Sequence, residues 1–148
     1  MDASIELQLA VDPDVLTVTA VNRGKQDLKL WTRDNSWGWA MFSLLLAKPD
    51  SQAWRELTAK AIRWTRNVPR ALELRAGGQL EYELRHADPS WEGVADVDRL
   101  GQFLQVRVRL RIPETPEALA QGVFIGEALS PPRLSQPPHH WLNTSTRP

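Results

Sequence analysis

The sequence contains no cysteine, and its 18 Lys and Arg residues are balanced by 18 Asp and Glu residues, so the formal net charge is +0. Without cysteine, the chain cannot use thiol catalysis, Cys-ligated zinc, iron–sulfur clusters or a disulfide framework. A neutral chain also lacks the excess of basic residues expected of a dedicated nucleic-acid binder. We therefore expect no thiol-based or cluster-based activity and no nucleic-acid partner.

Long hydrophobic runs are missing as well. The longest apolar stretch covers residues 39–47, which is far short of the roughly 20 residues that cross a bilayer. Residues 1–6 do not show the basic region followed by an apolar run that is typical of a secretory signal. The sequence therefore predicts a cytoplasmic protein without a membrane span.

Known catalytic motifs are also missing. The sequence has no G-x-S-x-G, no G-x-x-x-x-G-K-[ST], no G-x-G-x-x-G and no H-E-x-x-H. His139 and His140 are adjacent but have no evident third metal ligand, and the acidic residues of the polar loop 86–102 fit no calcium-loop spacing. We expect no metal, no cofactor and no enzymatic activity. A pair of carboxylates on facing strands that hydrolyses a glycoside stays open as an alternative.

What the sequence has in abundance is the alternation of apolar and polar residues that is typical of half-buried strands. Turn-forming residues such as Asp12-Pro13-Asp14 separate the alternating segments. The clearest strands are expected at residues 5–11, 16–21, 28–32, 71–75, 80–84 and 104–112. We predict an all-β fold, a single immunoglobulin-like antiparallel β-sandwich of about 7–9 strands, formed by residues 1–129.

Two segments in the first half are less regular. Residues 37–47 are nearly all apolar, which predicts a central strand buried on both faces, with a short helix as the alternative. Residues 53–66 carry apolar side chains at helical spacing, but the surrounding strands favour two irregular edge strands there. Helix and strand therefore both stay open for residues 53–66.

The C-terminal part of the sequence is expected to contain little regular structure. Thr115 and Pro116 predict a short helix that ends at Gly122, and a last short strand is expected at residues 123–125. Residues 130–148 are rich in proline and are expected to form a tail without strand or helix. We expect this tail to lie along the body of the protein or along a partner.

Tryptophan is frequent, with 7 Trp against 1 Tyr and 3 Phe. Since a packed aromatic side chain buries about 150–250 Å², most of the Trp residues should belong to the core, with Trp54 and Trp64 uncertain. Trp31 is expected to point away from the apolar face of its strand. Trp37 and Trp39 would share one face if they lie in a strand. Trp91 lies in a polar loop, where burial is least expected. The candidates for an exposed partner-binding surface are therefore Trp31, Trp37, Trp39 and Trp91.

Charged residues form stripes along the predicted strands. Arg107, Arg109 and Arg111 share one face of the strongest strand, and Glu81 and Glu83 share one face of another. We interpret these stripes as solvent-exposed faces whose charges pair across strands, each pair contributing about 0.2–1 kcal/mol. The alternative is an arginine ladder that faces phosphate or an acidic partner.

Two segments resemble small bacterial immunoglobulin-like domains. In the first, an alternating strand is followed by Asn22-Arg23-Gly24-Lys25 and a second alternating strand. In the second, residues 69–82, the Gly77-Gly78 turn precedes an alternating strand. These segments are similar to parts of the intracellular proteinase inhibitor family and of the N-terminal β-domain of deuterolysin-type metalloproteases. The resemblance implies a sandwich fold, and the inhibitor family would imply that the chain binds proteins through its loops and has no catalytic activity.

Together, these observations predict a non-catalytic protein-binding β-sandwich, such as an inhibitor, a toxin-neutralising protein or an adaptor in an assembly. The partner would be another protein, and an open edge strand could also pair with a second copy to form a homodimer. The alternative is a carbohydrate-binding module in which Trp37, Trp39 and Trp91 stack on sugar rings.

The substitution Trp39→Ala separates the two interpretations of Trp39. If Trp39 belongs to the core, the substitution should lower the free energy of unfolding by about 3–5 kcal/mol. If Trp39 is a recognition residue, the stability should hardly change while partner binding is lost. Denaturant unfolding and partner pull-down measure the two quantities, and no change in either would remove Trp39 from the candidates.

Overall fold

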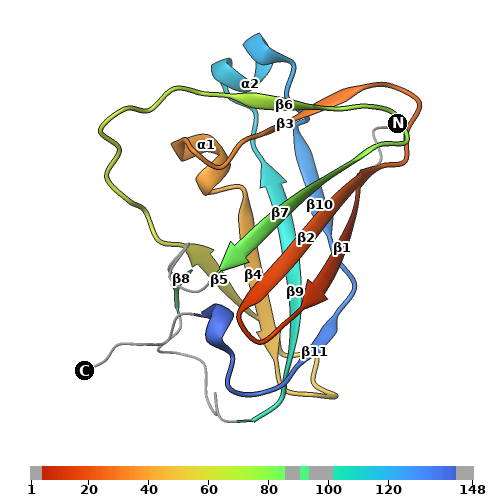
Figure 1. The fold of residues 1–148 in the computed structure, drawn as a ribbon, viewed down its shortest axis with the longest axis vertical. Helices are drawn as coiled ribbons and strands as arrows, with labels where there is room; N and C mark the ends of the chain where they lie inside the picture. The colour runs from red at the N-terminus through yellow and green to blue at the C-terminus, as the bar shows by residue number, and fades with distance from the viewer. Residues whose placement is uncertain (1–4, 86–90, 94–101, 143–148) are drawn as a thin grey trace.

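The computed structural model describes residues 5–85, 91–93 and 102–142, which form antiparallel sheets and two short α-helices, so the all-β prediction is confirmed. The first sheet has the order β1-β2-β7 and lies in front of a larger sheet (Figure 1). Its strands are β1 (Ile5–Val11), β2 (Val15–Asn22) and β7 (Gln79–Arg85). Each matches a segment in which apolar and polar residues alternate.

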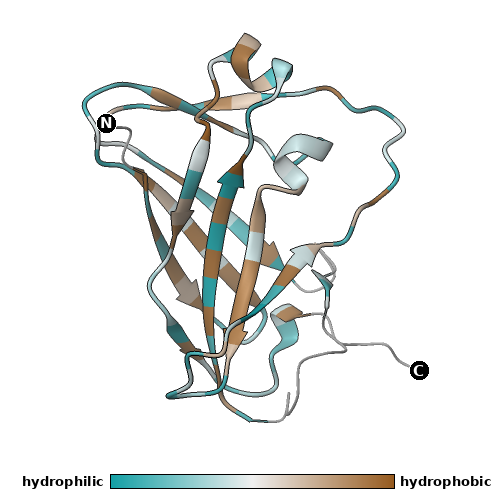
Figure 2. Ribbon diagram, turned by 180° about the vertical axis from the view of Figure 1, so that it is seen from behind, coloured by the Kyte–Doolittle hydropathy of each residue, from teal (hydrophilic) through white to brown (hydrophobic). Residues whose placement is uncertain are grey.

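The larger sheet has six strands, with β9 (Leu104–Ile112) near its centre. On one side β9 pairs with β4 (Phe42–Ala47), and the sheet continues through β5 (Arg55–Ala59) to β8 (Trp91–Glu92). Two short strands pair with the other side of β9. β11 (Arg133–Ser135) pairs with the beginning of β9, and β10 (Gly126–Leu129) pairs with its end. Figure 2 shows how hydrophilic and hydrophobic residues alternate along this sheet.

The remaining elements are short. β3 (Leu28–Trp31) and β6 (Ala71–Leu74) form a separate two-stranded sheet. α1 (Ser36–Trp39) follows β3, α2 (Pro116–Gln121) follows β9, and a 3-10 helix, η2, covers His140–Leu142. Among the residues that the structure describes, no helix has the length and apolar character needed to cross a membrane.

The two larger sheets share one hydrophobic core. Inward-facing side chains of β2, such as Leu16 and Val18, belong to the same buried cluster as Val106 and Val108 of β9. Tyr82 of β7 links the layers, because its ring meets Phe42 edge-on at 5.1 Å and its hydroxyl donates to the Trp31 carbonyl at 3.1 Å. Burial also raises the pKa of the Tyr82 phenol, so this hydroxyl stays protonated and remains a donor.

Asn22 fixes the turn on which the family resemblance rests. Its side chain is fully buried, accepts from the Gly24 amide at 2.9 Å and donates to the Leu74 carbonyl at 3.0 Å. Its main chain also exchanges hydrogen bonds with Gly77 and Gly78. Through these hydrogen bonds, Asn22 joins the β2–β3 connection to the β6–β7 connection. The polar groups of Asn22 can be buried because each of them has a hydrogen-bond partner.

Several local predictions need correction. Residues 37–47 are not one strand, because residues 36–39 form α1 and only residues 42–47 form the buried strand β4. Residues 53–66 contain a strand, as favoured, but only β5 is formed and no second strand follows it within residues 60–70. The strand predicted at residues 123–125 is wrong: the Val123 amide is bonded to the Ala118 carbonyl and the Phe124 amide to the Lys29 carbonyl, and the strand β10 begins only at Gly126. The α2 prediction itself is confirmed, with Thr115 as N-cap and Pro116 in the first turn.

The prediction of a tail without regular structure is wrong for residues 133–142. β11 continues the sheet along β9, and η2 places Trp141 and Leu142, both fully buried, against β2 and β7. The apolar surface of these two side chains drives the packing of the segment despite its prolines. The C-terminal part of the described chain is thus a component of the core.

The buried His139 makes stability depend on pH. Its Nε2 donates to the Gln102 carbonyl at 2.8 Å, its Nδ1 accepts from the Ser135 hydroxyl at 2.7 Å, and that hydroxyl accepts from Trp141 Nε1 at 3.1 Å. Burial lowers the pKa of His139 from its ordinary value of 6.5, and the bond to Gln102 only partly opposes this shift. The chain of hydrogen bonds is complete only with a neutral imidazole.

We expect His139 to lower the free energy of unfolding in acid. Because its folded pKa is depressed, the unfolded chain takes up the proton first, so the contribution is full above about pH 6.5 and is lost as pH falls through the lower folded pKa. Urea unfolding between about pH 7.5 and about pH 5 measures this effect. His139→Gln should flatten the pH dependence, whereas His140→Gln, at an exposed position, should keep it. An equal slope in His139→Gln and wild type would contradict the assignment.

Candidate functional site

The helix α1 is held against the end of β3 by Asn35 and Gly38. The Asn35 side chain caps the helix by accepting from the Gly38 amide at 2.9 Å, and it donates to the Thr32 carbonyl at 3.2 Å. A Cβ atom on Gly38 would lie 1.6 Å from that carbonyl oxygen, so only glycine fits there. The sequence Asn35-Ser36-Trp37-Gly38-Trp39 therefore forms a tight helical turn and cannot continue the preceding strand.

This turn separates two of the candidate recognition residues. Successive residues of an α-helix are about 100° apart, so residues two apart point to nearly opposite sides. Trp37 packs on Trp31, whereas Trp39 packs on Trp64. The expectation that Trp37 and Trp39 share one face is wrong, because it assumed a strand at this position.

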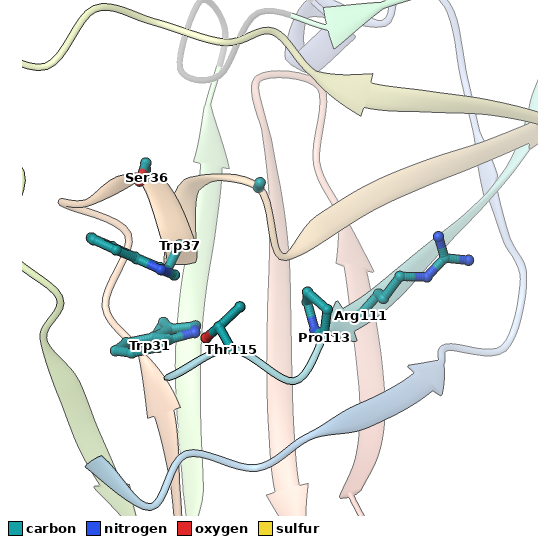
Figure 3. A pocket seen from close by; sticks show the side chains of 7 residues that line it. Trp31, Ser36, Trp37, Arg111, Pro113 and Thr115 are labelled. Atoms are coloured by element: carbon teal, nitrogen blue, oxygen red, sulfur yellow. The ribbon is translucent and has the colours of Figure 1, made fainter. Parts of the chain in front are cut away.

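A pocket of about 220 Å³ lies on the Trp37 side of α1 (Figure 3). The Trp31 and Trp37 rings are 6.0 Å apart and tilted by 37°, and they form one wall. Thr115 lies beside these rings, Pro113 lies farther along the pocket, and Arg111 lies at the far end (Figure 3). The structure thus brings two of the four predicted Trp residues together at one concave site.

Trp31 is nevertheless not an exposed residue. Only 1% of its surface is accessible, so the expectation of an exposed Trp31 is wrong. Trp31 points to the face of β3 opposite Leu30. That face is also covered, because β3 lies at the end of the larger sheets. Trp31 can therefore line the base of the pocket, while half-buried Trp37 supplies the accessible ring.

Trp39 takes part in a second aromatic cluster on the other side of α1. The Arg33 guanidinium lies 4.8 Å from the centre of its ring, and Trp64 meets it edge-on at 6.1 Å. Its indole nitrogen donates to the Lys60 carbonyl at 2.8 Å. Trp39 is half-buried and fixes the extended segment after β5 against α1.

Trp91 does not belong to either cluster. It begins β8 and is 6% exposed, so the expectation that it is exposed is wrong. Pairing of Trp91 with Ala59 of β5 directs its side chain into the core, which the polar sequence around it did not indicate. The acidic residues Asp88, Asp96 and Asp98 of the same loop lie outside the described residues.

The arginine stripe of β9 is paired across strands, as predicted. Arg109 contacts Glu56 of β5 at 3.1 Å, and Arg111 contacts Glu127 of β10 at 3.3 Å. Arg107 stacks on Trp54 at 5.5 Å and donates to the Ser130 carbonyl. Since these charges have partners, the stripe is not an open anion-binding ladder.

The described residues contain no group of three or more His, Asp or Glu side chains that could hold a metal ion. His139 is occupied in the buried hydrogen-bond chain, and His140 Nδ1 lies 2.8 Å from Asp14. The adjacent histidines thus face different partners.

Comparison with known proteins finds no matching family model, no matching curated protein and no matching solved structure.

Sequence reasoning missed the contributions of Arg33, Asn67 and Lys60 to the surface around α1. Asn67 accepts from the Ser36 amide at 2.9 Å and donates to the Ser36 hydroxyl at 2.8 Å. The only sequence signal was the run of basic residues after β5, which has no acidic residue between positions 60 and 70. We regard the pocket at Trp37 and the cluster at Trp39 as the two parts of the candidate site.

The geometry of α1 predicts that Gly38→Ala is strongly destabilising. The added methyl group would collide with backbone atoms of Thr32, so the free energy of unfolding should fall by about 3 kcal/mol or more. Gly77→Ala is the matched control, because no atom lies within 4 Å of the added Cβ and only its left-handed conformation costs about 1 kcal/mol. Denaturant unfolding compares the two variants, and a similar loss in both would contradict the close approach.

Proposed function

We propose that this chain is a non-catalytic, cytoplasmic protein-binding module whose two larger sheets form an immunoglobulin-like sandwich. The observation that carries the proposal is the pocket beside α1, where half-buried Trp37 stands over Trp31 and Arg111 lines the far end. Trp and Arg are enriched among the residues that dominate protein–protein binding energy. The partner would insert an apolar anchor side chain between Trp37 and Pro113.

The size of the pocket favours a protein anchor. Pockets for small molecules typically measure about 300–1,000 Å³, whereas this one measures about 220 Å³. A volume of this size suits a single side chain of a partner. The rigid aromatic wall also lowers the entropy that is lost when such a side chain binds.

The alternative, a carbohydrate-binding module, receives less support. It would need accessible ring faces at Trp37, Trp39 and Trp91. Trp91 is buried, and the Arg33 guanidinium covers one face of the Trp39 ring. Of these three residues, Trp91 therefore cannot stack on a sugar, and Trp39 offers at most one ring face.

A buried Ser–His pair supports a role without catalysis. Ser135 and His139 are hydrogen-bonded as a nucleophile and a base would be. Both side chains are buried, and Ser135 also accepts from Trp141. A substrate has no access to this pair, which instead stabilises the C-terminal segment.

The family resemblance fits the same proposal. Asn22 and the Gly77-Gly78 turn, which carry the resemblance, are joined by hydrogen bonds. A protease-inhibiting, toxin-neutralising or adaptor role would each use a surface of this kind. An edge-strand homodimer would form at β7, which pairs only with β2 in the described part of the chain.

Trp37→Ala tests the proposal. We expect wild-type protein to retain a specific protein from native lysate, and the variant to lose at least about tenfold in affinity for it, as hot-spot substitutions do. Trp54→Ala is the control, because Trp54 is also half-buried but packs on Arg107 away from the pocket.

Retained material is identified by mass spectrometry, and affinity is then measured with the purified partner. Retention on polysaccharide without any protein partner would overturn the proposal in favour of the carbohydrate-binding alternative. Equal affinity in wild type and Trp37→Ala would exclude the pocket as the binding site.

A further inference from the structure

The segment between β5 and β6 concentrates positive charge. Residues 60–70 contain Lys60, Arg63, Arg66 and Arg70 but no Asp or Glu, in a chain whose formal net charge is +0. Arg70 is paired with Asp34 at 2.7 Å. Within the described residues, Lys60, Arg63 and Arg66 have no acidic partner, unlike the arginines of β9.

The protein holds this segment at both ends and leaves its middle unbonded. The Lys60 carbonyl accepts from Trp39, and Asn67 is bonded to Ser36. Arg70 is bonded through its carbonyl to the Thr32 amide at 2.8 Å. Between these anchors, the backbone of residues 61–66 makes no hydrogen bond to other described residues. Figure 1 shows the segment as an extended loop that passes around α1.

Apolar side chains are exposed between the cations. Ile62 is 44% exposed and Val68 is 47% exposed. Val68 also lines a shallow depression of about 350 Å³ together with Asp34, Arg66 and Arg70. Positive and aliphatic side chains thus follow one another along the segment, and Arg66, Val68 and Arg70 share one surface at the depression.

We propose that residues 60–70 bind an extended acidic segment of a partner protein, in which Asp or Glu side chains alternate with apolar ones. This inference rests on the proposed protein-binding function and specifies the chemistry of the partner. The carboxylates would pair with Lys60, Arg63 and Arg66, and the apolar side chains would contact Ile62 and Val68. The unbonded backbone of residues 61–66 can accept a neighbouring extended chain.

A protein segment fits this surface better than a nucleic acid does. Single-stranded nucleic acids bind by stacking bases on accessible aromatic faces. Here Trp39 is covered on one face by Arg33, and Trp64 is engaged edge-on with Trp39.

The experiment uses the full-length protein and a fluorescein-labelled peptide in which Glu alternates with Leu. The same peptide with Gln in place of Glu is the neutral probe, and single-stranded oligothymidylate is the nucleic-acid probe. Arg63→Glu/Arg66→Glu reverses the charge of the segment. Lys25→Glu/Lys29→Glu is the matched control, because these two exposed lysines give the same change of net charge elsewhere.

We expect wild-type protein to bind the Glu–Leu peptide more tightly than either other probe. Arg63→Glu/Arg66→Glu should weaken binding about tenfold or more, because two charge pairs become repulsive, while the control should change it less than about twofold. Arg63→Gln/Arg66→Gln should give an intermediate loss. Binding should also weaken as salt is raised, because these charges are exposed.

Equal losses in both charge-reversed variants, equal binding of the Glu and Gln peptides, or tighter binding of oligothymidylate would each overturn the inference. The last result would assign the surface to nucleic acid. The proposed function is tested separately: it fails if wild-type protein retains no protein partner. If a partner is retained but Arg63→Glu/Arg66→Glu binds it as tightly as wild type, the present inference fails while the proposed function stands.

Discussion

The close contact between Gly38 and the Thr32 carbonyl is the constraint on which the candidate site depends. It leaves no space for a side chain, so α1 can pack directly against the end of β3 under the Asn35 cap. That packing sends Trp37 towards Trp31 and Trp39 towards Trp64. One backbone approach therefore creates both the pocket and the support for the basic segment, and the two surfaces lie on either side of a helix of only four residues.

Neutrality of the chain as a whole conceals an uneven distribution of charge. On the outer face of the six-stranded sheet, Arg109 and Arg111 are matched by Glu56 and Glu127 from neighbouring strands. Exposed pairs of this kind contribute little to stability, but they neutralise the charges of these two arginines locally. The cations at residues 60–70 are not matched in this way. The formal charge of +0 thus excludes a generally basic surface without excluding a local one.

The strands could be predicted from the sequence because their side chains alternate, and the pattern of β9 from Leu104 to Ile112 is the clearest case. The short elements could not, because long-range contacts decide them. Trp91 lies in a polar stretch yet is buried by pairing with β5, and β11 forms among prolines because β9 offers an open edge. For the site, the sequence indicated Trp31, Trp37 and Trp39 but not how they are arranged. Trp37 and Trp39 point in opposite directions because of a helical turn, whose signals are the Asn35 cap just before the apolar run and Gly38 within it.

The position of Trp141 has a consequence for biosynthesis. This side chain packs against β2 and β7 from near the end of the described chain, and β11 beside it completes one edge of β9. A nascent chain released as far as β9 would expose the apolar surface that η2 later covers. The core can close only after residue 142 has left the ribosome, because η2 packs against β2 and β7. Until then, the open edge of β9 is the part of the molecule that is most vulnerable to pairing with another nascent chain.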